Sequence, residues 1–247
     1  MTILWLDTVD STNSEIIRRA DTLDNMSVIS ARAQTAGKGQ RGNRWLSSAG
    51  SNLTFSILLK EDYGQFFLEA ASQFLITEAV TLALTDYLSS RQIKASIKWP
   101  NDIYVGDRKI CGVLIENSIG GRTLKRSVIG IGLNLNQIEF PADIPNPTSM
   151  KQQTGKDYDT HEELESFLEY FRNYAVFPAS DSVREEMHRK YLERMYRRDE
   201  KHRYLNPGTS EEFFCTIKGT TPVGELLAEM PDGSLKSFAF KEISYIV

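Results

Sequence analysis

Residues 37–45 read Gly-Lys-Gly-Gln-Arg-Gly-Asn-Arg-Trp, and they are followed by a turn-rich stretch and an apolar run at 53–59. The glycines match the spacing G-x-G-x-x-G, which binds a dinucleotide where a helix begins directly after the third glycine. Here the chain instead passes through further turn residues into a predicted strand. Neither the H-R-D nor the D-F-G motif of a protein kinase occurs downstream. The segment therefore argues against a Rossmann fold and against a kinase fold.

The same nine residues have the composition of an anion-binding loop. Lys38, Arg41 and Arg44 alternate with the glycines, and Trp45 ends the segment. Glycines let backbone N–H groups approach an anion, the cations supply the opposite charge, and an indole ring can stack on a base. We interpret the segment as an anion-binding loop, and the alternative is a flexible surface loop.

Outward from this loop, apolar periodicity predicts an α/β domain followed by a small β-rich unit. Strands are expected at 28–31, 53–59, 103–105, 110–116 and 127–135, with a short strand opening at Ile97. Helices are expected after a capping box formed by Thr12 and Glu15, and at 66–90, 161–175 and 182–201. From Phe213 onward the pattern contains only short strands. We therefore predict a mixed α/β (α+β) domain at 1–204 and a small β-barrel domain at 205–247.

Composition and charge exclude several classes of protein. Of the 247 residues, 40% are hydrophobic and 25% are charged, which is ordinary for a globular chain and unlike a disordered or fibrous one. The net charge of −4 argues against binding nucleic acid over the whole surface, although a local basic patch stays open. Cys111 and Cys215 have no CxxC spacing, which favours a reducing compartment. Because the sequence shows neither a signal peptide nor an apolar stretch of membrane-spanning length, we expect a soluble cytoplasmic protein with no membrane partner.

Glycines inside apolar strands indicate where a ligand could approach the sheet. Gly112 lies in the predicted strand that follows Asp107-Arg108-Lys109, and Gly130 and Gly132 lie in the strand 127–135. A glycine in a strand marks close approach by a ligand or another backbone. The three together suggest a slot for a flat, narrow ligand.

The sequence lacks the residue patterns that metal-dependent catalysis, serine hydrolysis and P-loop phosphate binding require. His161, His188 and His202 have no metal-ligand spacing, so we predict no metal site built from protein side chains. Neither a G-x-S-x-G elbow nor a Walker A loop occurs in the sequence.

Taken together, the motifs resemble those of the biotin protein ligases. The matching elements, in order, are Asp10-Ser11-Thr12-Asn13, the segment from Gln34 to Trp45, Lys98-Trp99-Pro100-Asn101-Asp102, Asp107-Arg108-Lys109 with Gly112, Gly130-Ile131-Gly132-Leu133-Asn134, and Thr148-Ser149. The resemblance covers residues 5–155 and implies the biotin/lipoate ligase type of fold, with an SH3-like C-terminal barrel.

The resemblance implies an AMP-forming ligation in two steps. Biotin reacts with ATP to give biotinyl-5′-AMP, and the biotinyl group then passes to a lysine on the biotin carrier domain of a carboxylase. ATP and biotin are the implied substrates, with Mg²⁺. The first step joins two anions, so the chemistry calls for cations around the α-phosphate.

The resemblance also implies the site residues. The catalytic residues are Lys109, Arg41 and Asp102, where Lys109 bridges the biotin carboxylate and the α-phosphate and Asp102 orients the incoming lysine or accepts its proton. The biotin-binding residues are Ser11, Thr12, Asn13, Gln34, Gly37, Lys38, Gly39, Gln40, Lys109, Gly112 and Gly130. The ATP-binding residues are Arg41, Gly42, Arg44, Trp45, Asn101, Gly132 and Asn134, with Trp45 stacked on adenine.

The chain departs from the family pattern in two ways. Gln40 stands where the family usually has arginine, and Asn43 stands where it often has arginine. Only nine residues precede Asp10, so we expect no DNA-binding domain and no DNA partner. A lipoate or octanoate ligase of the same fold and a non-catalytic biotin-binding sensor are the alternative functions, and a homodimer is left open.

Overall fold

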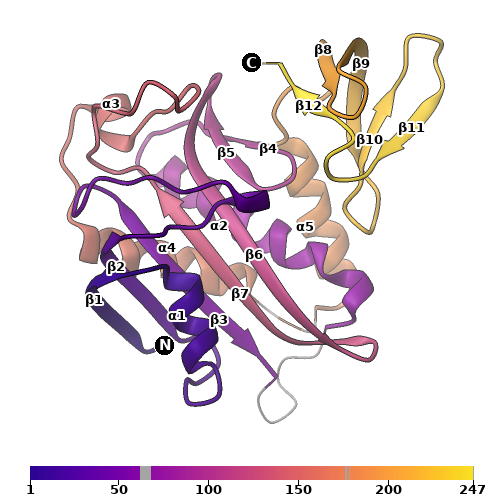
Figure 1. Cartoon of the computed structure of the whole chain (residues 1–247). Coiled ribbons are helices and arrows are strands. Elements are labelled where there is room, and N and C mark those ends of the chain that lie inside the picture. The colour runs from indigo at the N-terminus through magenta and orange to yellow at the C-terminus, as the bar shows by residue number, and fades with distance from the viewer. Residues whose placement is uncertain (62–67, 176, 178, 247) are drawn as a thin grey trace.

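This computed structural model describes residues 1–61, 68–175, 177 and 179–246, without the side chain of Arg41. Its main element is a seven-stranded sheet (Figure 1). In chain order its strands are β1 (Ile3–Val9), β2 (Val28–Gln34), β3 (Leu53–Lys60), β4 (Ser96–Lys98), β5 (Asp102–Val105), β6 (Arg108–Gly120) and β7 (Thr123–Leu133). Across the sheet they run β1-β2-β3-β7-β6-β5-β4. The pair β1 and β2 is parallel and the other pairs are antiparallel, which confirms the predicted mixed sheet.

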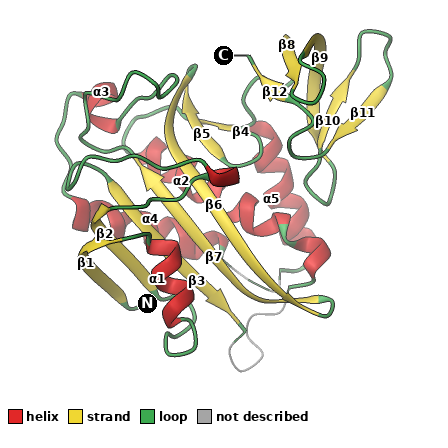
Figure 2. Cartoon of the chain, viewed as in Figure 1, coloured by secondary structure: helices red, strands yellow, loops and turns green. Residues whose placement is uncertain are grey.

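Five α-helices accompany the strands among the described residues (Figure 2). They are α1 (Thr12–Arg19), α2 (Phe74–Ser90), α3 (Met150–Thr154), α4 (Thr160–Tyr174) and α5 (Asp181–Glu193), with short 3-10 turns η1 (Gln40–Gly42) and η2 (Ala70–Ser72). Helices α2, α4 and α5 share one hydrophobic core with the large sheet. The α2 helix is apolar around most of its circumference because it lies between the sheet and the other two helices.

Side-chain alternation divides the sheet into two unlike faces. On β3 and β7, Phe55 is paired with Ile131 and Ile57 with Ile129, and all four belong to the core beneath the helices. The intervening positions pair Thr54 with Gly132 and Ser56 with Gly130. One face is therefore bulky and apolar, while at these positions the same two strands are small or polar on the other.

The α1 helix covers only one end of the second face. Its Ile16 and Ala20 pack on Ile29, Leu58 and Val128 in a separate small apolar cluster. The glycine-bearing parts of β6 and β7 lie outside that cluster. This uncovered part of the sheet is where a pocket forms.

A second, five-stranded sheet is formed by the C-terminal part of the chain. Its strands are β8 (Lys201–Asn206), β9 (Glu211–Thr220), β10 (Leu226–Glu229), β11 (Leu235–Phe238) and β12 (Ser244–Tyr245), in the order β11-β10-β9-β8-β12. In this order β11 and β12 lie at the two ends. The sheet begins at Lys201, a few residues before the predicted boundary at 204/205, and the division into two domains stays a prediction.

The two sheets share a continuous core. Tyr204, Ile217 and Phe238 from the small sheet belong to the same buried cluster as the helices and strands of the large one. The Trp99 indole N–H donates to the Gly224 carbonyl oxygen over 2.9 Å. The short strand β4 is thereby fixed against the small sheet.

Several element boundaries differ from the sequence-based expectations. The capping box was wrong, because Ser11 caps α1 while the Thr12 hydroxyl bonds to Ser56 and Gln34 and the Glu15 carboxylate bonds to Arg18 and Arg19. The helix predicted at 66–90 begins at Phe74, and residues 62–67 lie outside the described part. The helix predicted at 182–201 ends at Glu193, and Lys201, the last residue of the predicted range, is the first residue of β8. Strand β1 was not predicted, because its apolar residues alternate with few polar ones.

The aromatic contact between the sheet and α4 should carry a large share of the stability. Phe167 is fully buried, with its ring centroid 5.5 Å from that of Phe55 and 6.0 Å from that of Tyr87. Replacing a buried phenylalanine by alanine removes apolar contacts and leaves a cavity, at a cost of about 3–5 kcal/mol. We predict that Phe167→Ala lowers the free energy of unfolding in urea by about that amount. The exposed neighbour Glu169→Ala is the control, with an expected change within about 0.5 kcal/mol; equal effects of the two variants would contradict this packing.

Candidate active site

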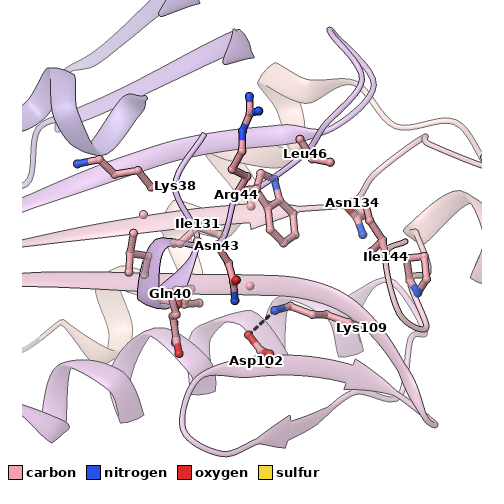
Figure 3. Close-up of a pocket in the computed structure, with 18 of the residues that line it drawn as sticks. Lys38, Gln40, Asn43, Arg44, Leu46, Asp102, Lys109, Ile131, Asn134 and Ile144 are labelled. Carbon is pink, nitrogen blue, oxygen red and sulfur yellow. Dashed lines mark hydrogen bonds and ion pairs between the residues drawn. The ribbon is translucent and has the colours of Figure 1, made fainter. Parts of the chain in front are cut away.

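A cavity of about 740 Å³ lies over the glycine-bearing face of the large sheet. Its walls come from segments far apart in the sequence: the start of α1, the loop 37–46, the hairpin of β5 and β6, strand β7 and the proline-rich loop 140–147. Figure 3 shows labelled side chains of the loop 37–46, of the hairpin, of β7 and of the loop 140–147 around this space. The proline-rich loop is held in place through Lys109, whose backbone N–H donates to the Asn146 carbonyl oxygen over 2.7 Å.

One end of the cavity is a network of amides and hydroxyls that ends at one carboxylate. The side-chain oxygen of Gln34 accepts from the Thr12 backbone N–H over 2.8 Å. The fully buried Ser56 hydroxyl lies 2.7 Å from the Thr12 hydroxyl oxygen and 2.5 Å from the Asn13 amide oxygen. The Asn13 amide nitrogen donates to the Glu116 carboxylate over 2.7 Å. Both ends of the Asn13 amide are thus fixed, so this end of the cavity presents polar groups in set directions.

The floor of the cavity is made by glycines whose missing side chains leave room for Trp45 and Asn13. Gly112 and Gly132 are directly paired between β6 and β7. A β-carbon on Gly132 would lie 2.2 Å from the Trp45 ring, and one on Gly130 would lie 2.2 Å from the Asn13 amide oxygen. The slot predicted beside Gly112 is therefore covered by an indole. The Trp45 Nε1–H is buried over Gly132 without a hydrogen-bond partner among the described residues.

Beyond the glycines lies an ion pair, Lys109 with Asp102. Lys109 Nζ is 2.7 Å from Asp102 Oδ1, and both side chains are partly exposed to the cavity (Figure 3). The bulged hairpin of β5 and β6 brings the two together, because it pairs Asp102 with Gly112 and Lys109 with Tyr104. Lys109 Nζ also lies 5.8 Å from the centroid of the Trp45 ring. A cation is thus held at a fixed point next to the glycine floor.

The loop at 37–45, called the glycine-basic loop below, contacts the sheet mainly through neutral side chains. The Gln40 amide nitrogen donates to the side-chain oxygen of Asn101, and the Asn101 amide nitrogen donates to the Val113 carbonyl oxygen over 2.9 Å. Arg44 is exposed, donates to the Thr35 carbonyl oxygen, and points away from Lys109 and Asp102 in Figure 3. Lys38 lies 3.6 Å from the Glu116 carboxylate.

Most residues predicted for the site come together. Those that line the cavity are Ser11, Thr12, Asn13, Gln34, Lys38, Gly39, Gln40, Arg44, Trp45, Asp102, Lys109, Gly112, Gly130, Gly132 and Asn134. Gly37, Gly42 and Asn101 are adjacent in the chain to lining residues but do not line the cavity themselves. The Arg41 side chain lies outside the described residues. The role assigned to each residue stays a prediction.

Four residues of the site had no role in the sequence-based prediction. Ser56 and Glu116 fix the Asn13 amide, and Lys98 and Tyr104 line the cavity next to Asp102. A signal for Ser56 was present, because Thr54 and Ser56 are polar at alternate positions of an otherwise apolar strand. Lys98 belongs to the motif at 98–102, but nothing in the sequence shows that its side chain faces the cavity.

Burial shifts the pKa values of two side chains next to the Lys109–Asp102 ion pair. Burial lowers the pKa of the Lys98 ammonium and raises the pKa of the Tyr104 phenol. Lys98 Nζ donates to the Tyr104 hydroxyl oxygen over 3.0 Å. The phenol therefore stays protonated and can act only as a neutral hydrogen-bonding group.

The described residues contain no group of three or more His, Cys, Asp or Glu side chains able to hold a metal ion. His188 is paired with the buried Glu78 and His202 with Glu200, while the His161 ring stacks on Trp5. Magnesium is characteristically held by substrate phosphates together with one or two carboxylates. A magnesium ion in this cavity would therefore belong to the ATP substrate.

No described helix has both the length and the apolar character needed to cross a membrane.

Comparisons with known proteins agree with this geometry. The Biotin/lipoate A/B protein ligase family matches residues 5–134 of the chain. The Biotin--[acetyl-CoA-carboxylase] ligase of Paracoccus denitrificans is 33% identical over 174 residues, which cover 67% of this chain and 69% of that protein. The Bifunctional ligase/repressor BirA of Escherichia coli (strain K12) is 28% identical over 254 residues, covering 97% of this chain and 72% of that protein.

A solved structure extends the likeness to nearly the whole chain. The biotin protein ligase from Aquifex aeolicus in complex with biotin and ATP superposes with a TM-score of 0.78 at 27% identity, covering 98% of this chain and 97% of that one. The family match spans more than half of the 247 residues and includes the amide network, the glycine floor and the ion pair. The chain therefore belongs to the Biotin/lipoate A/B protein ligase family, in its biotin protein ligase branch.

Proposed function

We propose that this cavity carries out both half-reactions of an ATP-dependent biotin protein ligase. In the first, a carboxylate oxygen of biotin forms a bond to the α-phosphorus of ATP, while the bond from that phosphorus to pyrophosphate breaks and leaves its electron pair on pyrophosphate. In the second, the amine of an acceptor lysine bonds to the acyl carbon of biotinyl-5′-AMP, AMP leaves, and the amine loses a proton. The acceptor is the biotin carrier domain of a carboxylase.

The observation that carries this proposal is the Lys109–Asp102 ion pair at the end of a slot with an amide network at its other end. The biotin carboxylate is already a nucleophile at neutral pH, so the first step needs charge compensation rather than a base. A cation fixed at 2.7 Å from a carboxylate is oriented before substrates arrive. Lys109 can then contact the biotin carboxylate and the α-phosphate, and Asp102 can orient the incoming lysine or accept its proton.

The amide network favours biotin over the alternative acids. A ureido ring offers two N–H donors and one carbonyl acceptor, and the side chains of Thr12, Asn13 and Gln34 offer complementary groups. A lipoate dithiolane or an octanoate tail offers no N–H donor or carbonyl acceptor to this network and would place apolar surface against polar groups, which lowers affinity. A sensor without activity has no need of the fixed Lys109–Asp102 pair.

We further propose that DNA is not a partner and that the protein works in the cytoplasm. The net charge of −4 supports the first point. Two free, buried thiols, Cys111 and Cys215, support the second, because such thiols are typical of a reducing compartment. A homodimer stays open.

The activity itself gives the first test. Incubation of the protein with biotin, ATP and a carboxylase carrier domain should add one biotinyl group to one lysine, detected by mass spectrometry. The same incubation with lipoate or octanoate in place of biotin should leave the carrier mass unchanged. A mass gain with lipoate alone would reassign the protein to the other branch of the family.

Removal of the fixed cation tests the mechanism. Loss of one preorganised group that stabilises a developing charge raises a barrier by about 2–4 kcal/mol, which is roughly 30- to 1,000-fold in rate. We predict that Lys109→Met slows biotin- and ATP-dependent pyrophosphate release by that factor. The control is Lys125→Met, at an exposed lysine paired with Glu61 at the far end of β7. Equal rates for Lys109→Met and wild type would contradict the assigned role.

Variants in the glycine-basic loop test how the protein retains biotinyl-5′-AMP. The Gln40 amide forms neutral hydrogen bonds, which are about half as strong as charge-assisted ones. We therefore predict that Gln40→Ala speeds dissociation of biotinyl-5′-AMP by less than about tenfold, whereas Arg41→Ala speeds it more. Dissociation rates measured by displacement of labelled biotinyl-5′-AMP decide the order. A faster rate for Gln40→Ala would identify Gln40 as the main contact.

A further inference from the structure

Glu116 contacts the amide network but does not itself line the cavity. It lies on β6 opposite Val128, on the face of the sheet that carries α1. Its oxygen Oε2 accepts from the Asn13 amide nitrogen over 2.7 Å, and its oxygen Oε1 lies 3.6 Å from Lys38 Nζ. The two oxygens thus hold two different segments of the cavity wall, and the proposed function gives this carboxylate no task.

The bond to Glu116 decides which end of the Asn13 amide faces the cavity. A carboxylate can only accept hydrogen bonds, whereas a side-chain amide has a donor end and an acceptor end. The Asn13 nitrogen must therefore face Glu116, and the oxygen must face the other way. A β-carbon on Gly130 would lie 2.2 Å from that oxygen, so the oxygen lies directly on the cavity floor. The reversed amide would place an oxygen against the carboxylate and lose a charge-assisted hydrogen bond.

The same choice sets the direction of the hydrogen bonds that follow. The Ser56 hydroxyl lies 2.7 Å from Thr12 Oγ1 and 2.5 Å from Asn13 Oδ1, but it has only one proton to donate. With the Asn13 oxygen turned toward it, that proton goes to Asn13. The Thr12 hydroxyl then donates to Ser56 or to the Gln34 side-chain oxygen, which lies 3.3 Å away. A group that can only accept, at one end of the network, thus orders the side chains as far as Gln34.

An amide oxygen held in this way makes this end of the cavity an acceptor. A carbonyl oxygen has two lone pairs, so Asn13 Oδ1 can accept from Ser56 and from one ligand at the same time. We propose that Glu116 is a positioning residue, which fixes the polarity of the Asn13 amide and thereby selects ligands whose ring carries an N–H donor at this end. The inference rests on the proposed function, in which that ring is the ureido ring of biotin. A ring that offers only acceptors, such as a lactone, would meet the Asn13 oxygen with no hydrogen atom between the two.

The ion pair with Lys38 has the smaller part in this arrangement. The side chains of Lys38 and Glu116 are 42% and 34% exposed, and ion pairs in contact with solvent contribute little. The bond to Asn13 instead joins a charged acceptor to an amide that is 3% exposed, where the loss of a partner costs more. Substitutions can therefore separate the two contacts of Glu116.

An exchange of chemical groups between positions 13 and 116 tests the assignment. Glu116→Gln lets Asn13 turn either way, because glutamine offers both a donor and an acceptor. Asn13→Asp alone places two carboxylates against each other. In the double variant the new amide donates to the new carboxylate, whose second oxygen again faces Gly130 as an acceptor. The matched control is Glu61→Gln, which removes an exposed carboxylate that also pairs with a lysine, Lys125, at 3.1 Å.

Biotin affinity is measured by calorimetry, and pyrophosphate release is measured as a function of biotin concentration. We expect Glu116→Gln and Asn13→Asp each to weaken biotin binding about tenfold, and the double variant to recover to within about threefold of wild type. Lys38→Met should weaken binding less than about fivefold, and Glu61→Gln should match wild type. In Glu116→Gln the KM for biotin should rise while kcat at saturating biotin stays within about twofold of wild type, since the ring contact is shared by ground state and transition state.

Two results would overturn the assignment. One is a double variant that binds biotin no better than Glu116→Gln, and the other is a loss in Lys38→Met equal to that in Glu116→Gln. Failure of the wild-type protein to bind biotin would instead overturn the proposed function. If Asn13→Asp does not fold on its own, the comparison of Glu116→Gln with the double variant still measures the recovery.

Discussion

The pairing of β6 with β7 imposes the constraint on which the site depends, because at Gly112 and Gly132 these two strands carry side chains on one face only. Cys111 opposite Leu133 and Val113 opposite Ile131 fill the core beneath the helices, whereas Gly112 opposite Gly132 leaves the backbone exposed between them. The Trp45 ring and the Asn13 amide lie directly on that backbone, where a single added β-carbon would overlap them. Glycine weakens a strand interior, and the burial of the opposite face by α2, α4 and α5 offsets this cost. The depth of the cavity is thus a consequence of how the core is packed.

Charge is distributed along this surface in the same order as it is distributed along the substrates. Neutral amides lie over β3 and β7, and the cations Lys109 and Lys98 lie on the strands toward β4. A molecule with a neutral ring at one end and a carboxylate at the other matches that gradient, and ATP adds further negative charge at the cationic end. Both lysines extend from strands rather than from a loop. Cations placed in this way need little rearrangement when the anions arrive, which is how preorganised charge lowers a barrier.

The two described cations of the loop 37–45 have protein partners of their own. Among its described side chains, Arg44 bonds to a backbone carbonyl oxygen and Lys38 pairs with Glu116, so neither is directed at the Lys109–Asp102 pair. Gln40, where the family usually has arginine, joins the loop to Asn101 through a neutral hydrogen bond. Trp45 and Gln40 are thus the described neutral side chains through which the loop contacts the sheet, and Lys109 supplies a cation from the sheet itself.

The strands of both sheets and the glycine slot could be predicted from the sequence, because alternation and glycine spacing depend on neighbours close in the chain, and the resemblance of the motifs to a family supplied most residues of the cavity. The N-cap at Ser11 was misplaced by one residue. A helix was extended across Arg194–Lys201, where bridges of Met195 to Ile97 and of Arg198 to Ile217, and a positive φ at Arg197 and Asp199, replace the helical turns. Three contacts could be seen only once the chain was folded: Ser56 and Glu116 fix Asn13, Trp45 lies on Gly132, and Tyr245 packs on Lys98. The partners in these contacts are separated by tens to more than a hundred residues, and their meeting depends on strand order and side-chain direction, which no local pattern encodes.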